Sequence, residues 1–383
     1  MKERVYLASP HMSEEGYEQQ YIQEAFDTNW IAPLGNNVTM FEKEVCDYVK
    51  AKKSVALSSG TAAIHLALKL AGVQENDYVF CQSLTFVATV NPIVYEKAIP
   101  VLIDSDKDTW NMSVEALEKA FIKYEKIGKK PKAVIVVHLY GICANIKEIK
   151  QLCEKYQVVL IEDAAESLGS HVDGKYTGTF GDFGIFSFNG NKIITTSGGG
   201  MLLCNRDTAQ QDAEKATFLA TQARENKRYY EHQEIGYNYR LSNVTAGIGR
   251  GQLKVLTKRI EKKRQIYKKY QEGFLSITDI MLMPYDRKDT YHNCWLTTIV
   301  LNSHSKVKPD DIIDALELEN MEARRVWNPM HLQPLYKDCD YIDFGGVSQT
   351  LFEYGVCLPS DTKMTDEIQE KVIEIVKGLW EHV

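Results

Sequence analysis

The chain has 383 residues, of which 44% are hydrophobic and 25% are charged, as is typical of a globular protein that buries a large core. At this length we expect one large domain and a smaller one. The net charge of -7 argues against non-specific binding to nucleic acid or to a membrane surface, so we expect neither as a partner.

Residues 1–20 contain no continuous apolar segment, and no stretch of the chain approaches the roughly 18 apolar residues that a membrane span requires. The eight cysteines form no CxxC pair and no cluster with histidine. We interpret them as small buried hydrophobic residues in a reducing compartment. Both features predict a cytoplasmic protein.

Short apolar, β-branched runs alternate with amphipathic stretches up to residue 205. Seven runs predict strands: SVALSSG (54–60), DYVFCQS (77–83), IPVLIDSD (99–106), KAVIVVHLYG (132–141), VVLIEDA (158–164), FGIFSFN (183–189) and GGMLLCN (199–205). Continuous apolar strands are typical of a parallel sheet that helices cover on both faces. The pattern therefore predicts an α/β fold whose ligands bind at the carboxyl ends of the strands.

After residue 241 the pattern changes to one long helix over about 243–274, followed by mixed α and β segments. The basic run KRIEKKRQIYKK (258–269) has apolar residues at helical spacing, so we interpret its lysines as the solvated face of that helix. We place the domain boundary near residue 250. This gives a large domain over 1–250 and a smaller α+β domain over 251–383.

The segment SSGTAAIHL (58–66) predicts a glycine turn followed by a helix that begins near Gly60 and Thr61. The free N–H groups and the dipole of a helix N-terminus form an anion site. Most turns between a strand and a helix look similar, so the segment alone is a weak signal. It has neither a Walker A loop nor a GxGxxG fingerprint, and the nucleotide-hydrolase and dinucleotide interpretations lack their required residues.

Asp163 ends the predicted strand VVLIED, where the crevices of such sheets open. An acid there binds a metal, caps a helix or pairs with a cationic ligand. Glu162 and Glu166 flank it, but no histidine is spaced to complete a metal site, so we expect no metal. Helix capping and a cationic partner both remain open for Asp163 on this stretch alone.

Lys192 lies in FSFNGNKIITTSGGG (186–200), a predicted loop between two strands. A lysine held in such apolar surroundings is partly desolvated, which favours the neutral amine and makes it a competent nucleophile toward an aldehyde. The alternative is a surface lysine in a turn, which residue type alone favours.

Together these features fit pyridoxal phosphate, which needs a lysine for its aldehyde, an acid for its ring nitrogen and a cup for its phosphate. A lysine, an acid and a helix N-terminus all fall in the predicted α/β domain, in Lys192, Asp163 and Gly60–Thr61. Phe86, in SLTFVATVNPI (83–93), has two interpretations: a ring that stacks on the cofactor, or an ordinary core residue.

The motifs SGTAA (59–63), SLTFVATVNPI, VVLIEDAAESLGS (158–170), GIFSFNGNKIITTSGGGML (184–202) and GYNYRLSN (236–243) resemble the DegT/DnrJ type of nucleotide-sugar aminotransferase. The resemblance runs from SPHM (9–12) to CLPSDTKMT (357–365). It implies a fold-type I transferase with a mostly parallel seven-stranded sheet. Lys192 would then carry the cofactor, Asp163 would face the pyridine nitrogen, and Ser187 would bind the phosphate beside Gly60 and Thr61.

The resemblance also assigns further residues. Glu166 would face the ring hydroxyl, a position at which many members have glutamine. Asn238 matches a residue that such enzymes supply from the neighbouring subunit, which implies a homodimer with shared active sites. Ile31, Pro33, Trp327 and His331 are candidates for the sugar pocket.

The segment NGNKIITTSGGGM (189–201) is similar to members that aminate UDP-linked 4-keto-6-deoxy-N-acetylhexosamines. EARRVWNPMHLQPLY (322–336) is similar to the substrate segment of that branch, with Arg325 in place of proline and Asn328 in place of lysine. We expect a transaminase with L-glutamate as amino donor that makes a UDP-amino sugar for surface glycan, exopolysaccharide or glycoprotein synthesis.

Two alternatives share this fold. A sugar dehydratase of the same type has histidine in place of the lysine, whereas Lys192 is present here. A non-catalytic regulator that only binds the cofactor would be favoured by a fused DNA-binding module, but no basic helix-turn-helix segment occurs in the sequence.

Overall fold

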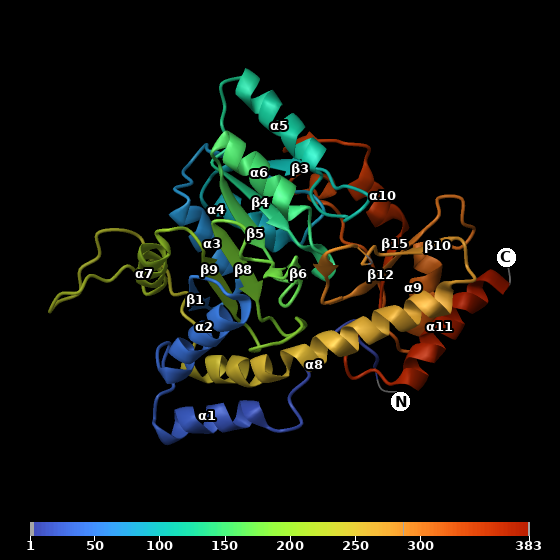
Figure 1. The fold of residues 1–383 in the computed structure, drawn as a ribbon, viewed down its shortest axis with the longest axis horizontal. Helices are drawn as coiled ribbons and strands as arrows, with labels where there is room; N and C mark the ends of the chain where they lie inside the picture. The colour runs from blue at the N-terminus through green and yellow to red at the C-terminus, as the bar shows by residue number, and fades with distance from the viewer. Residues whose placement is uncertain (1–3, 286, 382–383) are drawn as a thin grey trace.

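The computed structural model describes residues 4–285 and 287–381 and has a central sheet covered by helices on both faces (Figure 1). The sheet has eight strands in the order β1-β9-β8-β5-β4-β2-β3-β14. Its strands are β1 (Lys53–Leu57), β2 (Tyr78–Gln82), β3 (Ile99–Ile103), β4 (Ala133–Val137), β5 (Val159–Asp163), β8 (Phe183–Ser187), β9 (Gly200–Cys204) and β14 (Asp340–Ile342). The seven runs predicted from the sequence are the first seven of these strands.

The eighth strand, β14, comes from the C-terminal part of the chain and pairs in parallel with β3, Tyr341 opposite Leu102. Only Ile342 of its three residues is both apolar and buried, so the strand lacks the continuous apolar pattern that marks the other strands. β9 is antiparallel to both of its neighbours, β1 and β8. The expected α/β architecture is therefore confirmed, with one strand more than the sequence pattern predicts.

Alternate residues of the parallel strands point to opposite faces of the sheet. Cys81 and Ile135 lie with α3 (Gly60–Leu70), α4 (Asn91–Tyr95) and α7 (Ala209–Ala220) in one apolar cluster. Phe80 and Val134 lie with α5 (Val114–Lys126) and α6 (Ile146–Tyr156) in another. Both faces are thus covered, which explains why these strands are apolar throughout.

The helix predicted over about 243–274 is α8 (Asn243–Phe274), and it runs along the base of the molecule from the large sheet to the small domain (Figure 1). Its first half packs beside α1 (Tyr17–Asp27) and α2 (Asn36–Val49), and its second half beside α11 (Asp366–Glu381). Most of its lysines face solvent, as expected, but Lys263 is buried and donates to the Ser360 carbonyl oxygen at 2.6 Å. Burial lowers the pKa of Lys263 to about 8.

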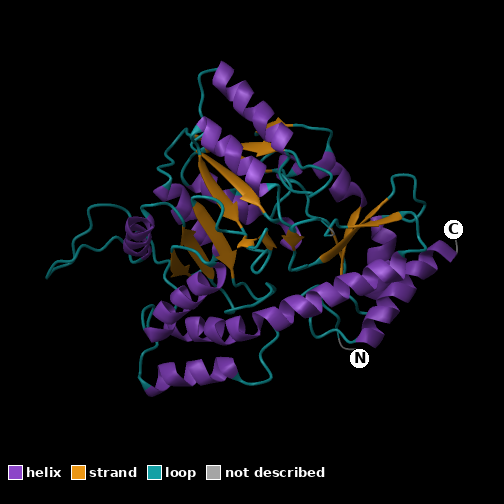
Figure 2. Cartoon of the chain, viewed as in Figure 1, coloured by secondary structure: helices purple, strands orange, loops and turns teal. Residues whose placement is uncertain are grey.

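The small domain is built on an antiparallel sheet in the order β10-β12-β15-β13, seen beside the C-terminal helices in Figure 2. Its elements are β10 (Ile280–Leu282), β12 (Thr297–Leu301), α9 (Pro309–Leu318), β13 (Arg324–Arg325), η3 (Met330–Leu332), α10 (Val347–Tyr354), β15 (Gly355–Leu358) and α11. The proposed boundary at residue 250 lies inside the continuous helix α8, and β14 belongs to the large sheet. A division into 1–250 and 251–383 therefore remains a proposal about folding units.

Short elements complete the fold. They are η1 (Val87–Thr89), η2 (Leu139–Gly141) and a three-stranded sheet of β6 (His171–Val172), β7 (Lys175–Tyr176) and β11 (Thr290–Tyr291). All eight cysteines are free, and six of them are buried. No helix of the described part of the chain combines the length and the apolar character needed to cross a membrane.

Candidate active site

A cavity of about 460 Å³ opens at the carboxyl ends of the parallel strands, between the large sheet and a segment of the small domain. This is the edge at which open α/β sheets bind ligands. Eight of the residues predicted from the sequence line it together: Gly60, Thr61, Phe86, Asp163, Glu166, Ser187, Lys192 and Trp327. They come from five separate segments, and the fold brings them to one place.

The N-terminus of α3 forms one end of the cavity. The Ser59 side chain caps the helix by accepting from the Ala62 N–H at 3.0 Å, and the amides of Gly60 and Thr61 have no acceptor among the described residues. Ser187 is close by, since a Cβ on Gly60 would lie 3.2 Å from the Ser187 Cβ. Free amides, a helix dipole and a hydroxyl together suit an anion such as a phosphate.

The glycine run after Lys192 is explained by close backbone packing in the same region. A Cβ on Gly200 would come within 2.3 Å of the Ser59 carbonyl group, so a larger residue would push β9 away from the turn before α3. A Cβ on Gly199 would meet the Thr196 hydroxyl at 2.2 Å. Gly200 therefore lets β9 approach the anion end of the cavity, and Gly199 leaves room for the Thr196 side chain in the loop before β9.

Asp163 is the last residue of β5, and its side chain enters the cavity from the floor. The Thr89 hydroxyl donates to Oδ2 at 2.7 Å and the Ala165 N–H donates to Oδ1 at 3.2 Å. Burial raises the pKa of Asp163, and the hydrogen bonds and Lys192 only partly oppose this effect. A buried carboxylate of this kind is stabilised by a cationic partner, which a protonated ring nitrogen would provide.

Glu162, one residue earlier, points away from the cavity and is fully enclosed. Its carboxylate accepts the N–H groups of Phe180 and Gly181, each at 2.6 Å, and that of Gly178 at 2.8 Å. His138 Nε2 donates to it at 2.9 Å, because Nδ1 of the same ring accepts from the Ala144 N–H. Glu162 thus fixes the loop before β8, and of this adjacent pair only Asp163 is available to a ligand.

Lys192 and Glu166 form an ion pair at the centre of the cavity, with Nζ and Oε1 3.2 Å apart and side-chain exposures of 13% and 4%. The Tyr140 N–H donates to the other oxygen, Oε2, at 2.7 Å. Burial raises the pKa of Glu166 to about 7, with Lys192 and the Tyr140 amide opposing it. Lys192 is therefore not a solvated turn lysine, and the carboxyl beside it titrates near neutral pH.

Phe86 and Trp327 form the apolar wall, with ring centroids 5.6 Å apart. Phe86 remains 55% exposed, so core packing does not account for its position. The Trp327 N–H donates to the Tyr140 hydroxyl at 3.2 Å, which ties the small-domain segment to the large domain. The wall is suited to a planar ring and to a ligand that enters past it.

Four predicted site residues do not line this cavity within one chain. Ile31 and Pro33 are exposed near α2, and Asn238 is exposed on the segment that follows α7. His331 Nδ1 lies 2.7 Å from the Ser83 hydroxyl, and its ring stacks on Tyr341 at 3.8 Å. Their roles toward a ligand remain predictions.

The two positions that depart from the substrate segment of the similar branch also lie off this wall. Arg325 is paired with Asp310 at 2.6 Å on the surface. The Asn328 side-chain oxygen is buried and has no hydrogen-bond partner among the described residues. Neither residue lines the cavity.

Three residues that sequence reasoning missed shape the site. Thr89 holds Asp163, Tyr140 holds Glu166 through its N–H, and Trp295 lies beneath Lys192, with Nζ 4.1 Å from the centre of its ring. Tyr140 has a left-handed backbone with φ of 53°, which turns its amide toward Glu166. The tyrosine and the tryptophan look like ordinary core aromatics in the sequence, so only the fold reveals their contacts.

The residues present fit pyridoxal phosphate. An amine, a buried carboxylate without a full set of partners and a helix N-terminus with free amides surround one cavity, and that volume falls in the range of small-molecule sites. The three groups match the aldehyde, the ring nitrogen and the phosphate of that cofactor.

Comparison with known proteins agrees with this chemistry. Residues 12–377 match the DegT/DnrJ/EryC1/StrS aminotransferase family. EpsN of Bacillus subtilis (strain 168) is 53% identical to this chain, over the whole of this chain and 97% of its own length. A GDP-perosamine synthase of Vibrio cholerae is 34% identical over 95% of this chain and 96% of its own.

A UDP-4-amino-4,6-dideoxy-N-acetyl-beta-L-altrosamine transaminase of Campylobacter jejuni is 36% identical over 63% of this chain and 62% of its own. Among solved structures, a DegT DnrJ EryC1 StrS aminotransferase from Brucella abortus is similar, with a TM-score of 0.87, 27% identity and 95% coverage of both chains. The family match covers all the segments that form the cavity.

Proposed function

Because the chain belongs to the DegT/DnrJ/EryC1/StrS aminotransferase family, we propose that it moves the amino group of L-glutamate to C4 of a UDP-linked 4-keto-6-deoxy-N-acetylhexosamine. The coarser activity, pyridoxal-phosphate-dependent amination of a sugar, follows from the family and its relatives. The nucleotide, the sugar and the donor are the parts that we propose. A cytoplasmic location and a role in surface glycan, exopolysaccharide or glycoprotein synthesis belong to the same proposal.

One observation carries the proposal, namely that Lys192, Asp163 and the N-terminus of α3 face one cavity. Pyridoxal phosphate, when bound, supplies the carbonyl that accepts the amino group and a ring that withdraws electrons. Gly60, Thr61 and Ser187 would hold its phosphate, and Asp163 would keep a proton on its ring nitrogen. Lys192 would hold the cofactor's aldehyde carbon and, once released, move a proton at the reacting carbon.

Glu166 would lie beside the ring hydroxyl in this arrangement. Its carboxyl titrates near neutral pH, so it is able to give or accept a proton there, which a glutamine at the same position is not. Phe86 would cover one face of the ring, and Trp327 would border the space left for the sugar.

The choice of UDP over GDP rests on the segment 189–201 and on the Campylobacter relative. The GDP-perosamine synthase of Vibrio cholerae favours a second candidate, a GDP-linked ketosugar, because its similarity covers nearly the whole chain. Either ketosugar would use the same cavity, so the two candidates are distinguished by the nucleotide and the sugar that the enzyme accepts.

We also propose that the active enzyme is a homodimer in which Asn238 completes the site of the partner subunit. The segment after α7 projects away from the body of the chain (Figure 1) and exposes Tyr229, Tyr230 and Ile235 at 63%, 80% and 81%. Exposed apolar side chains on a projecting segment favour burial against another chain. Ile31 and Pro33 would join the sugar pocket across the same interface, and His331 would border it from its own chain.

The test is a panel of UDP-, GDP- and dTDP-linked 4-ketosugars incubated with the enzyme and ¹⁵N-labelled glutamate. Mass spectrometry then follows transfer of the label. Preferred labelling of the UDP-N-acetyl-4-keto sugar supports the proposal, and preferred labelling of a GDP sugar replaces it with the second candidate. Consumption of the ketosugar without nitrogen transfer would indicate the dehydratase, and no turnover with any sugar would favour the regulator.

A further inference from the structure

The side chain of Lys192 lies on the face of an indole. Its Nζ atom is 4.1 Å from the centre of the Trp295 ring, and Trp295 is only 2% exposed. Trp295 comes from the segment just before β12 of the small domain, whereas Lys192 follows β8 of the large one. The contact therefore joins the two halves of the chain at the reactive group.

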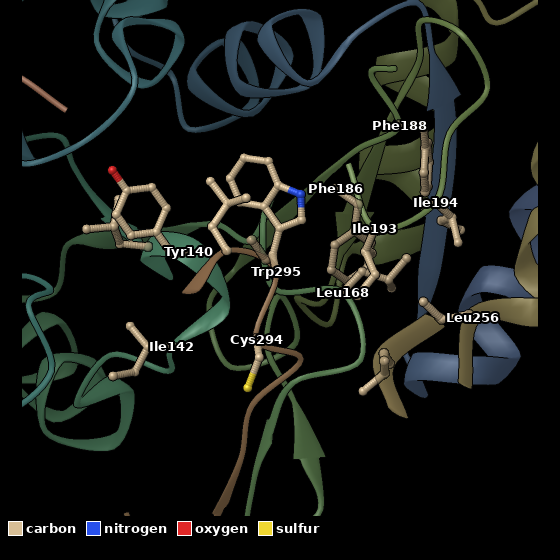
Figure 3. Packing of buried hydrophobic residues seen from close by; sticks show 14 of the residues in the cluster. Tyr140, Ile142, Leu168, Phe186, Phe188, Ile193, Ile194, Leu256, Cys294 and Trp295 are labelled. Atoms are coloured by element: carbon tan, nitrogen blue, oxygen red, sulfur yellow. The ribbon is translucent and has the colours of Figure 1, made fainter. Parts of the chain in front are cut away.

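The indole is fixed in place and not a mobile lid. Its Nε1–H donates to the Asn191 carbonyl oxygen at 2.8 Å, which also holds the backbone next to Lys192. Asn293, two residues earlier, donates to the carbonyl oxygens of Glu166 and Leu168 at 2.9 and 3.0 Å. Figure 3 shows the ring between Tyr140 on one side and Phe186 and Ile193 on the other.

The ring and the acid together form a complete receptor for an ammonium group. A cation over an indole face is attracted by the ring's quadrupole, and the attraction is strongest where water is excluded. Glu166 provides a carboxylate at 3.2 Å from the same Nζ atom. Because the lysine side chain is only 13% exposed, both contacts act in a largely dry environment.

A lysine that carries a cofactor by its amine has to leave it whenever a substrate amine takes its place, and the released side chain then needs a defined position. We infer that Trp295 is a positioning residue that holds the released Lys192 ammonium, together with Glu166, between the two halves of the amino transfer. This inference rests on the proposed use of Lys192, and it assigns to the small domain a direct part in the reaction.

The experiment uses the full-length protein stripped of cofactor, so it is independent of the substrate. Lys192 is labelled with acetic anhydride at fixed pH, and its peptide is quantified by mass spectrometry in the wild type, Trp295→Phe and Trp295→Leu. Loss of a cation–π contact in a dry site should speed labelling by about three- to tenfold in Trp295→Leu. Trp295→Phe, which keeps a smaller ring face, should fall between Trp295→Leu and the wild type.

Ile64→Ala is the control, because Ile64 lines the same cavity and is as buried as Trp295, each being 2% exposed, but it is aliphatic. It should label at the wild-type rate. Equal acceleration in Ile64→Ala and Trp295→Leu would mean that only access had changed, and would overturn the inference. Unchanged labelling in Trp295→Leu would overturn it as well.

A second readout follows the indole itself. Lys192→Met, which removes the charge and keeps the length, should shift the tryptophan fluorescence of the cofactor-free protein in the wild-type background but not in Trp295→Phe. An identical shift in both backgrounds, or no shift in either, contradicts the contact. If Trp295→Leu does not fold, the comparison of Lys192→Met in the wild-type and Trp295→Phe backgrounds tests the contact by itself. A negative result in the labelling and fluorescence experiments would not change the interpretation of the sugar panel. A lack of turnover in the panel would not change the interpretation of these two experiments.

Discussion

Nζ of Lys192 and Oε1 of Glu166 lie 3.2 Å apart, and both side chains are nearly excluded from solvent. The lysine enters from the loop after β8 and the glutamate from the turn after β5, so the pair exists only in the folded chain. The pair shares one cavity with Asp163 and the N-terminus of α3.

Lys192→Ala should reduce amino transfer by about a thousandfold or more, because both cofactor attachment and proton movement need the amine. The far-ultraviolet circular dichroism should stay unchanged, since the substitution removes no core side chain. Lys43→Ala, which removes an exposed lysine of α2, is the control and should keep full turnover. Transfer by the Lys192 variant within tenfold of the wild type would contradict the assignment.

Asp163→Asn should weaken cofactor binding by about 10- to 100-fold, since a neutral amide does not hold the ring proton and a hydrogen bond to a charged group is worth roughly 1.5–3 kcal/mol. Equilibrium titration of the cofactor's absorbance measures this. Asp104→Asn is a matched control: Asp104 is a buried acid directly after strand β3 of the same sheet, and it is bound by Ser348. An equal loss of cofactor affinity in both variants would favour a helix-capping role for Asp163.

Glu166 should make the stability of the cofactor-free protein depend on pH. Its pKa rises from 4.5 in a free side chain to about 7 in the fold, so the folded protein binds the extra proton and stability falls as the pH rises between these values. Glu166→Gln removes the carboxyl group and therefore this loss of stability at higher pH. The melting temperature of the variant relative to the wild type should therefore increase from pH 4.5 to 7.5.

Glu154→Gln, on the exposed face of α6, provides the comparison and should show no such trend. A constant difference between Glu166→Gln and the wild type across the same pH range would show that the fold does not raise the pKa of this carboxyl.

Asn238→Ala should weaken cofactor binding and dimerisation together if the side chain completes the partner's site, because linked equilibria stabilise each other. The apparent cofactor affinity of the wild type should then rise with protein concentration, as sedimentation and absorbance on the same samples would show. Gln233→Ala, on the same projecting segment, should behave like the wild type. Full cofactor occupancy in a monomer would refute the shared site.

The sequence predicted most of the fold because its parallel strands are buried on both faces and therefore read as unbroken apolar runs. β14 was not predicted because it has three residues, of which only Ile342 is buried, and because it pairs with β3, which is distant in the sequence. α8 was predicted with its observed ends because an amphipathic pattern of this length is compatible with few structures other than a long helix.

The site was predicted only where a motif carries the chemistry. Lys192, Asp163 and Gly60 lie in local signatures, whereas Thr89, Tyr140 and Trp295 act through contacts between segments far apart in the chain. Trp295 in particular follows a cysteine and precedes a leucine, and nothing in that stretch distinguishes it from a core aromatic. The roles of Ile31, Pro33 and Asn238 remain predictions, because these residues lie away from the cavity of their own chain.

The most direct test of the central claim is to reduce the cofactor-loaded enzyme with borohydride and map the modified peptide by mass spectrometry. Borohydride converts a cofactor bound through a lysine imine into a stable secondary amine. We expect one modified residue, Lys192, and loss of the modification when L-glutamate is added before the reductant. A modification on another lysine, or one on Lys192 that glutamate does not prevent, would contradict it.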